Sequence, residues 1–132
     1  MNITKTYEVP FPKQKVYANW VSPNTVIAPA TSMDICPQVG GHYRLIMDTP
    51  EFTSKNEGVF LIVEPTSHVR YTWEWNHDGE VSEIDVQFSS TDVGTAIVIE
   101  HSGFTQQQSA DMHAQGWDSY IEGFIQFLSN KD

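Results

Sequence analysis

The fold is decided by the segment from Thr105 to Leu128, which has the sequence TQQQSADMHAQGWDSYIEGFIQFL. On a helix, where successive residues are about 100° apart, its apolar and aromatic residues fall on one stripe. That stripe consists of Ala110, His113, Trp117, Tyr120, Ile121, Phe124 and Leu128. Thr105 followed by Gln108 has the form of a capping box, which predicts where the helix begins. A stripe with so many rings must be covered by a broad apolar surface.

Length and composition predict one domain spanning residues 1–132. The chain has 132 residues, of which 39% are hydrophobic, and this is enough to bury a core. Lys and Arg number 7 and Asp and Glu number 17, so the formal net charge is −10. This charge argues against binding to nucleic acid or to anionic membranes.

A reducing, cytoplasmic location is expected. Cys36 is the only cysteine, which rules out an internal disulfide, and residues 1–5 lack the apolar stretch of a signal peptide. No segment reaches the roughly 18–20 consecutive apolar residues that a membrane-spanning helix needs. Monomer and homodimer both stay open.

The first forty residues predict one strand and two short helices. Residues 3–9 alternate between apolar and polar side chains, which indicates a strand. Apolar residues one turn apart predict a short helix over 13–20. A serine followed by proline is typical of a helix start and predicts a second short helix over 22–29. Residues 30–39 have little periodicity and are predicted to form a loop.

A meander of strands follows, separated by turns rich in Gly, Asn, Asp and Pro. Residues 42–48, 68–75, 82–88 and 95–101 alternate in polarity, whereas 58–64 is so uniformly apolar that both of its faces are expected to be covered. The short connections between these segments indicate antiparallel pairing.

Together these elements predict an α+β fold. It has a curved antiparallel sheet of about six strands wrapped around the long C-terminal helix, with two short helices after the first strand. Because a helix touches a concave sheet along only part of its width, a cavity can form between them.

The order of these elements resembles the helix-grip (START-like, Bet v-like) fold of the START-like (SRPBCC) superfamily. Several local phrases are similar to its branch named after the activator of heat-shock-protein-ninety ATPase. The phrases are Val16-Tyr17-Ala18-Asn19-Trp20, Val39-Gly40-Gly41-His42-Tyr43-Arg44, Gly58, Tyr71-Thr72-Trp73, Gly94-Thr95 with Ile97 and Ile99, His101-Ser102-Gly103-Phe104, and His113 with Gly116-Trp117. The chain departs from many relatives at Ala28 to Met33, where they carry tryptophan, so the mouth of a pocket is expected to differ.

The resemblance implies a pocket between sheet and helix that, in different relatives, holds lipids, polyketides or other apolar molecules. It supplies no shared catalytic constellation, because some relatives are cyclases or dehydratases, others sequester ligands, and the namesakes stimulate a chaperone ATPase by docking to it. Function must therefore be argued from the site.

The candidate ligand-binding residues are those that face the space between sheet and helix. Aromatic rings there offer a large contact area for a flat or acyl ligand, although the same rings could simply fill the core. Trp75 and Tyr120 are the best candidates, because each can satisfy a polar atom at a wet cavity edge. The full set is Tyr43, Tyr71, Trp73, Trp75, Ile84, Val86, Phe88, Ile97, His101, His113, Trp117, Tyr120 and Phe124.

His101 and His113 are polar residues on otherwise apolar faces. They could be hydrogen-bonding or acid–base groups of a catalytic pocket, or histidines satisfied within the core. Their spacing is not that of metal ligands, and only one thiol is present, so no metal and no cofactor are predicted.

Other residues carry weaker hypotheses. Arg44 and Glu74 are expected to be solvated or paired across the sheet, with binding of an anionic group as the alternative. Gly116 and Gly123, seven residues apart on the helix, either allow a close approach or are merely tolerated. The acidic excess is most simply a solvating surface, or else a docking surface for a basic partner.

Three functions stay open. The first is binding of a hydrophobic small molecule without turnover. The second is a protein-interaction module resembling the chaperone-ATPase activators, and the third is a cyclase or hydratase-like enzyme that uses His101, His113 and Tyr120.

Overall fold

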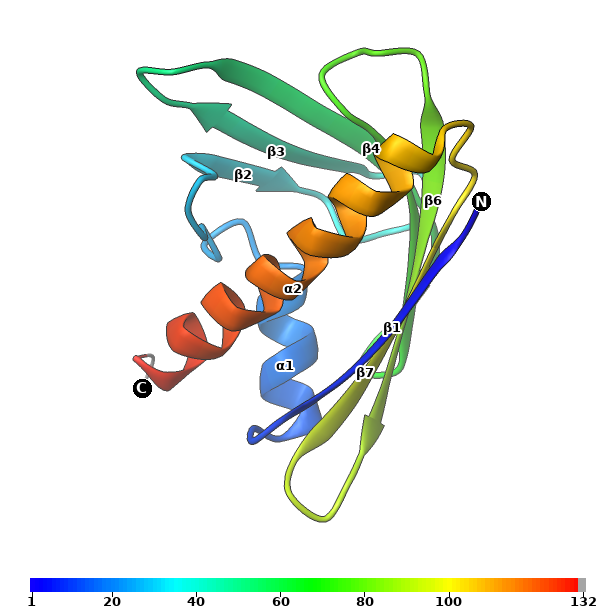
Figure 1. Cartoon of the computed structure of the whole chain (residues 1–132). Coiled ribbons are helices and arrows are strands. Elements are labelled where there is room, and N and C mark those ends of the chain that lie inside the picture. The colour runs from blue at the N-terminus through cyan, green and yellow to red at the C-terminus, as the bar shows by residue number, and fades with distance from the viewer. Residues whose placement is uncertain (131–132) are drawn as a thin grey trace.

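The computed structural model describes residues 1–130 and has a helix-grip architecture (Figure 1). One antiparallel sheet holds seven strands, slightly more than the expected number. The strands are β1 (Ile3–Val9), β2 (Ser32–Ile35), β3 (His42–Asp48), β4 (Thr53–Glu64), β5 (His68–Glu74), β6 (Val81–Ser90) and β7 (Thr95–Ser102). The helices are α1 (Lys13–Trp20) and α2 (Gln107–Ser129).

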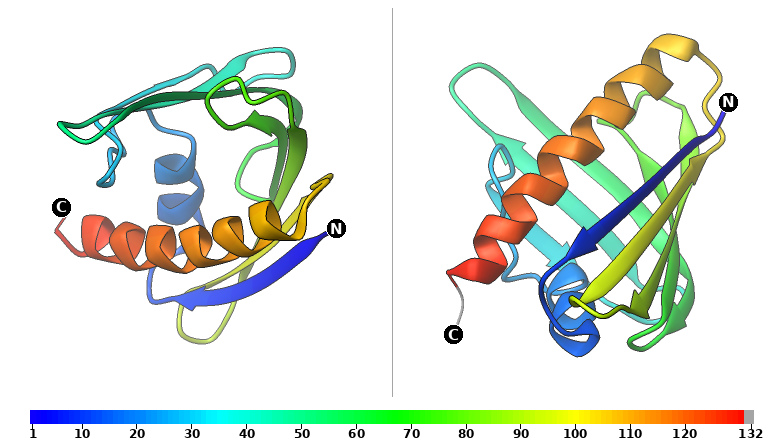
Figure 2. Two further views of the ribbon diagram at one scale, coloured as in Figure 1. Left: turned by 45° about the horizontal axis from the view of Figure 1, so that its top comes forward. Right: turned by 60° about the horizontal axis from the view of Figure 1, so that its bottom comes forward.

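The strand order is β1-β7-β6-β5-β4-β3-β2, so β2 to β7 form a meander and β1 pairs with the last strand. In that last pairing Ile3 lies opposite His101. The β4–β5 ladder shifts register between Phe60 and Ile62, and such a bulge bends a strand. The sheet curves, and α2 runs across its concave side (Figure 2). This confirms the predicted α+β helix-grip fold.

Residues 22–29 differ from the prediction, because they form turns rather than a second short helix. The Thr25 N–H donates to the Ser22 carbonyl oxygen at 3.2 Å, and the Asn24 N–H donates to the Ser22 hydroxyl oxygen at 3.1 Å. The serine therefore closes a turn. A segment this short, interrupted by proline, gains too few hydrogen bonds to offset the cost of helix nucleation.

Two strands also differ from the prediction. β2 lies in the predicted loop, where Met33 and Ile35 alternate with exposed residues in a pattern too short to identify from sequence. β4 begins before the predicted range 58–64, and its outer side chains Val59 and Leu61 are exposed. The expectation that both faces are covered is wrong, because both helices lie on the other face (Figure 2).

The start of α2 is not the predicted capping box. The helix begins at Gln107, and Gln106 at the N-cap position makes no side-chain capping bond. The Thr105 hydroxyl and N–H instead donate to the Glu80 carboxylate at 2.5 and 2.8 Å. These bonds lower the pKa of Glu80 and tie the helix start to the segment before β6.

Side chains fill the space between the sheet and α2 at the end where α1 lies. Trp20, at the end of α1, packs edge-on against Phe88 of β6 and Phe124 of α2, with ring centroids 5.8 and 5.3 Å away. Its ring also stacks on Trp117 at 6.0 Å. Trp20 is 1% exposed and Phe124 is 0% exposed, so these rings form a buried, closely packed cluster between α1, α2 and the sheet.

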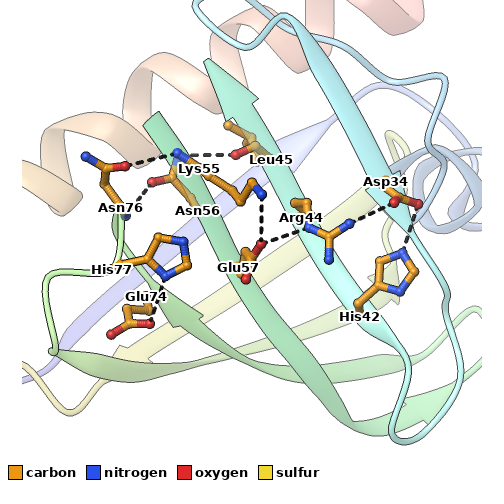
Figure 3. A network of polar contacts seen from close by, with 10 residues as sticks. All are labelled: Asp34, His42, Arg44, Leu45, Lys55, Asn56, Glu57, Glu74, Asn76 and His77. Atoms are coloured by element: carbon orange, nitrogen blue, oxygen red, sulfur yellow. Dashed lines mark hydrogen bonds and ion pairs between the residues drawn. The ribbon is translucent and has the colours of Figure 1, made fainter. Parts of the chain in front are cut away.

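The outer face of the sheet carries paired charges (Figure 3). Arg44 donates to Glu57 at 2.9 Å and to Asp34 at 3.0 Å. His42 Nε2 donates to the same Asp34 at 2.8 Å and lowers the pKa of its carboxyl. Glu74 accepts from the Gly79 N–H at 2.9 Å. Arg44 and Glu74 are thus engaged by neighbouring residues, which supports the pairing interpretation over an anion site.

Candidate functional site

A cavity of about 440 Å³ lies between the first half of α2 and the concave side of the sheet. Side chains of β3, β5, β6 and β7 form its walls, α2 covers it, and the segment before β2 borders it. Its lining is mostly apolar and aromatic, and its volume is in the range of small-molecule sites. The other half of α2 lies over the filled core.

Most of the predicted ligand-binding residues surround this cavity. They are Tyr43, Tyr71, Trp73, Trp75, Ile84, His101, His113, Trp117 and Tyr120. Both residues singled out from the sequence, Trp75 and Tyr120, are among them.

The remaining predicted residues belong to the filled core and not to the cavity wall. They are Val86, Phe88, Ile97 and Phe124. They have the same inward direction as the wall residues, but they lie toward the end that Trp20 occupies. Alternation along a strand indicates which face is buried, and it does not indicate where along the strand the interior is empty.

Other lining residues were missed. Leu45 and Met47 share a strand face with Tyr43, so their alternation could have identified them. Turns and loops, whose paths the sequence did not predict, supply Phe52, Asp78 and the segment from Ile27 to Ala30. The further missed residues, Ser109, Met112 and Ser119, lie on α2, where Gly116, which the sequence had indicated as a possible place of close approach, also lines the cavity. Their signal was weak, because Met112 is an exposed residue at the rim.

The turn beside the cavity is held by two asparagines (Figure 3). The Asn76 N–H donates to the side-chain oxygen of buried Asn56 at 3.0 Å, and the Lys55 N–H donates to the side-chain oxygen of Asn76 at 3.2 Å. These bonds join the β5–β6 turn to β4. They fix the positions of the adjoining lining residues Trp75 and Asp78.

His101 is locked in a neutral form. The Trp117 indole N–H donates to His101 Nδ1 at 3.1 Å, so Nδ1 carries no proton and Nε2 does. Nε2–H therefore donates to the Ser82 hydroxyl at 2.7 Å, which donates in turn to the Trp73 carbonyl oxygen at 3.3 Å. Burial, followed by the nearby His113, lowers the pKa of His101 to about 3.

His113 is engaged in the same way. The Trp73 indole N–H donates to its Nε2 at 3.3 Å, so its Nδ1–H donates to the Ser109 carbonyl oxygen at 2.8 Å. Each nitrogen of both histidines has a protein partner. This geometry supports the interpretation of satisfied core histidines over that of acid–base groups.

Tyrosines form the opposite wall. The rings of Tyr43 and Tyr71 are stacked with centroids 4.5 Å apart. Burial raises the pKa of Tyr43 to about 12, and it raises the pKa values of Tyr71 and Tyr120 well above their usual range. The Tyr120 hydroxyl and the Trp20 indole N–H are buried without a hydrogen-bond partner.

Within residues 1–130, no three His, Cys, Asp or Glu side chains are arranged to hold a metal ion. In the same range, neither helix is long and apolar enough to cross a membrane.

The sequence profile of the family described as activator of Hsp90 ATPase homolog 1-like protein matches residues 10–129. The chain belongs to this family. The match extends from the end of α2 back to the residues before α1, so it includes the elements around the cavity. It confirms the resemblance to this branch of the START-like superfamily. Among curated proteins, none matches the chain in sequence.

Several solved structures share the fold of this chain. Protein MLL2253 from Mesorhizobium loti has 22% identity and a TM-score of 0.84, with 100% of this chain and 99% of that chain covered. The AHSA1-like protein from Aeromonas hydrophila has 20% identity and a TM-score of 0.84, with 98% and 92% covered. DynU16, from the dynemicin biosynthetic locus, has 15% identity and a TM-score of 0.82, with 98% and 47% covered. At such identities the likeness shows the fold alone.

Proposed function

We propose that this protein binds a small, largely apolar molecule in the cavity between α2 and the sheet. The observation that carries the proposal is the hollow itself: about 440 Å³ is left open where an aromatic stripe meets a concave sheet, although the same stripe is tightly packed one turn further along. Proteins of this fold commonly bind hydrophobic ligands.

The lining also favours binding over turnover. Wall rings such as Trp73 and Tyr71 provide flat apolar contact, and aromatic contact of this kind is a major source of affinity. The two histidines have no free nitrogen to offer a substrate. Of the three groups on which the enzyme hypothesis was based, both histidines are therefore engaged within the protein, and only Tyr120 lacks a partner.

The interaction-module hypothesis rests on the family name and on the net charge of −10. On the outer sheet face, however, Asp34 and Glu57 already pair with Arg44. A salt-sensitive complex with a chaperone would favour that hypothesis over ligand binding. A cytoplasmic location stays a prediction.

The test is native mass spectrometry of the purified protein, followed by titration with the neutral dye Nile red. Trp73, Trp75 and Trp117 line the cavity, so an apolar ligand there is expected to quench tryptophan emission and to raise the melting temperature with its concentration.

A blocking variant and a matched control locate the site. A Cβ at Gly116 would meet no atom within 4 Å, so Gly116→Leu adds a side chain at the cavity edge without a backbone clash. Glu122→Leu adds the same side chain to an exposed position of α2 that does not line the cavity. Nile red binding is expected to weaken in Gly116→Leu alone. Equal binding by both variants, or no binding of any apolar compound by the parent protein, would contradict the proposal.

A further inference from the structure

The wall of the cavity carries one charged side chain, and that side chain is negative. The described residues that line the cavity include no Lys or Arg, and Asp78 is the one Asp or Glu among them. His101 and His113 each accept a hydrogen bond from an indole N–H, which a protonated ring nitrogen cannot do, so both are neutral. The charge that a ligand meets at this wall is therefore a carboxylate.

Asp78 lies at the mouth of the cavity, where the lining residues are exposed to solvent. It belongs to the turn between β5 and β6, and its backbone N–H donates to the Trp75 carbonyl oxygen at 3.0 Å. One of its carboxylate oxygens accepts from the Glu80 N–H at 2.9 Å, which holds the side chain in the turn. Within residues 1–130 this carboxylate forms no ion pair. Its charge is thus accessible and not offset by a bound cation of the protein.

The neighbouring Trp75 supplies an aromatic face at the same mouth. Most rings of the wall pack against another ring, and these are Tyr43, Tyr71, Trp73, Trp117 and Tyr120. Within residues 1–130 the half-exposed Trp75 and the exposed Phe52 have no such ring partner. The face of an indole ring is negative and attracts a cation more strongly than the faces of other side-chain rings do. The mouth therefore contains two groups that favour positive charge.

The deeper part of the cavity accommodates neither sign of charge. Burial raises the pKa of Tyr43 to about 12, which shows that an anion is disfavoured there, and it lowers the pKa of His101 to about 3, which shows the same for a cation. A charged ligand must therefore insert its apolar part and leave its charged group at the mouth. An anion at the mouth would meet the like charge of Asp78, whereas a cation would meet an opposite charge.

We infer that the ligand is a cationic amphiphile, whose apolar body fills the cavity and whose ammonium group lies at the mouth beside the Asp78 carboxylate. This inference rests on the proposed binding function and narrows it to a chemical class. The formal net charge of −10 favours the approach of the same class of ligand. Fatty acids and other carboxylates are excluded as preferred ligands.

Three naphthalene probes test this inference by displacement of Nile red at pH 7.5: trimethyl(2-naphthylmethyl)ammonium, 2-naphthylacetate and the neutral 2-ethylnaphthalene. Both ions are strongly hydrated, so a comparison between them reports mainly the sign of the charge. The cation is expected to bind about tenfold more tightly than the anion at low ionic strength, because an exposed carboxylate attracts one and repels the other. Added salt should reduce this preference.

Asp78→Asn supplies the decisive comparison. The asparagine oxygen can still accept from the Glu80 N–H, so the turn is kept while the charge is removed. The cation is expected to bind about threefold more weakly and the anion more tightly, whereas the affinities for 2-ethylnaphthalene and Nile red should be unchanged. The matched control is Asp92→Asn, which removes the same charge from an exposed residue that does not line the cavity and should keep the preference.

The outcomes separate the two proposals. Three results would overturn the inference of a cationic ligand and leave the binding function standing: equal or tighter binding of the anion by the parent protein, a preference that survives in Asp78→Asn, and a preference that Asp92→Asn reduces to the same extent. Failure of all three probes to displace Nile red or to bind directly would overturn both.

Discussion

The two halves of α2 carry one continuous aromatic stripe, yet they cover different interiors. From Ile121 to Leu128 the helix lies on packed side chains, and Phe124 and Leu128 are 0% exposed. From Ser109 to Tyr120 it covers the cavity. The difference lies next to α1, whose Trp20 packs against Phe124 at the filled end and contacts the lining residues Trp117 and Tyr120, but does not itself line the cavity. Helical periodicity thus defines a buried face, whereas a single large side chain from another element decides which part of that face is hollow.

The two ends of the interior also differ in the polarity of the side chains that face it. His101, His113 and Tyr120 turn inward at the hollow end, and Ile121, Phe124 and Leu128 form the packed end. Inward polar groups need either partners or a ligand, whereas inward apolar groups need only volume. Polar residues on an otherwise apolar stripe are therefore the better marker of the cavity.

The largest expected difference between the two ends is in stability. Phe124→Ala should lower the free energy of unfolding by about 3–5 kcal/mol, because it removes a ring from a fully packed interior. Trp75→Ala, at the half-exposed edge of the cavity, should cost less than about 1.5 kcal/mol while it weakens ligand binding. Urea denaturation measures both. Similar losses from the two variants would mean that the ends are packed alike.

The hollow end should also be the acid-sensitive end. The folded-state pKa of His101 is about 3, below the ordinary value near 6.5 of an unfolded histidine, so between these values the unfolded chain binds a proton that the folded chain does not. Stability should therefore be unaffected by this group above about pH 6.5 and should fall as the pH decreases toward 3.

His101→Gln tests this expectation, because glutamine can still accept from Trp117 and donate to Ser82 without titrating. Between pH 7 and 4 the parent protein should lose roughly 2–3 kcal/mol more than the variant. The carboxylates titrate in both proteins, so their contributions to the pH dependence of stability cancel in the difference between the two. An NMR titration of His101 with a midpoint near 6.5 would refute the expectation.

The smallest expected difference concerns the two helix glycines. A Cβ at Gly116 would meet nothing within 4 Å, so Gly116→Ala should stabilise the helix by about 0.5–1 kcal/mol. A Cβ at Gly123 would lie 2.5 Å from the Ile27 Cγ2 atom, so Gly123→Ala should gain nothing or lose stability. Thermal denaturation compares them. Adding Ile27→Ala to Gly123→Ala should recover part of the stability difference between the two glycine variants. An equal gain from Gly116→Ala and Gly123→Ala would mean that Ile27 does not approach position 123 closely.

Much of the fold could be predicted because it depends on local periodicity. The inward set Tyr43, Tyr71 and Ile84 followed from alternation alone, and the α2 stripe from the helical repeat. The parts that failed depend on contacts between distant residues. Thr105 binds Glu80 rather than capping its own helix, and β2 forms because a neighbouring strand is present to pair with it.

The candidate site could be predicted only in part. Residues were correctly placed on the inner face, but Phe88 and Phe124 could not be separated from Trp73 and Trp117 without the position of Trp20. Only the family resemblance pointed to Ala28 to Ala30 at the mouth, because the loops there follow no repeat from which their path could be predicted. The partners of the histidines were equally hidden, since each bond joins residues from different elements.

Those histidine bonds form a circuit that leaves α2 and returns to it. It passes from Trp117 of α2 through His101 of β7, Ser82 of β6 and Trp73 of β5, and reaches α2 again at His113. These hydrogen bonds therefore hold α2 over the cavity without a bound ligand. Because these bonds order the walls before any ligand is present, a ligand would not have to offset the entropy of ordering them, and only its own lost freedom and desolvation would oppose the contacts.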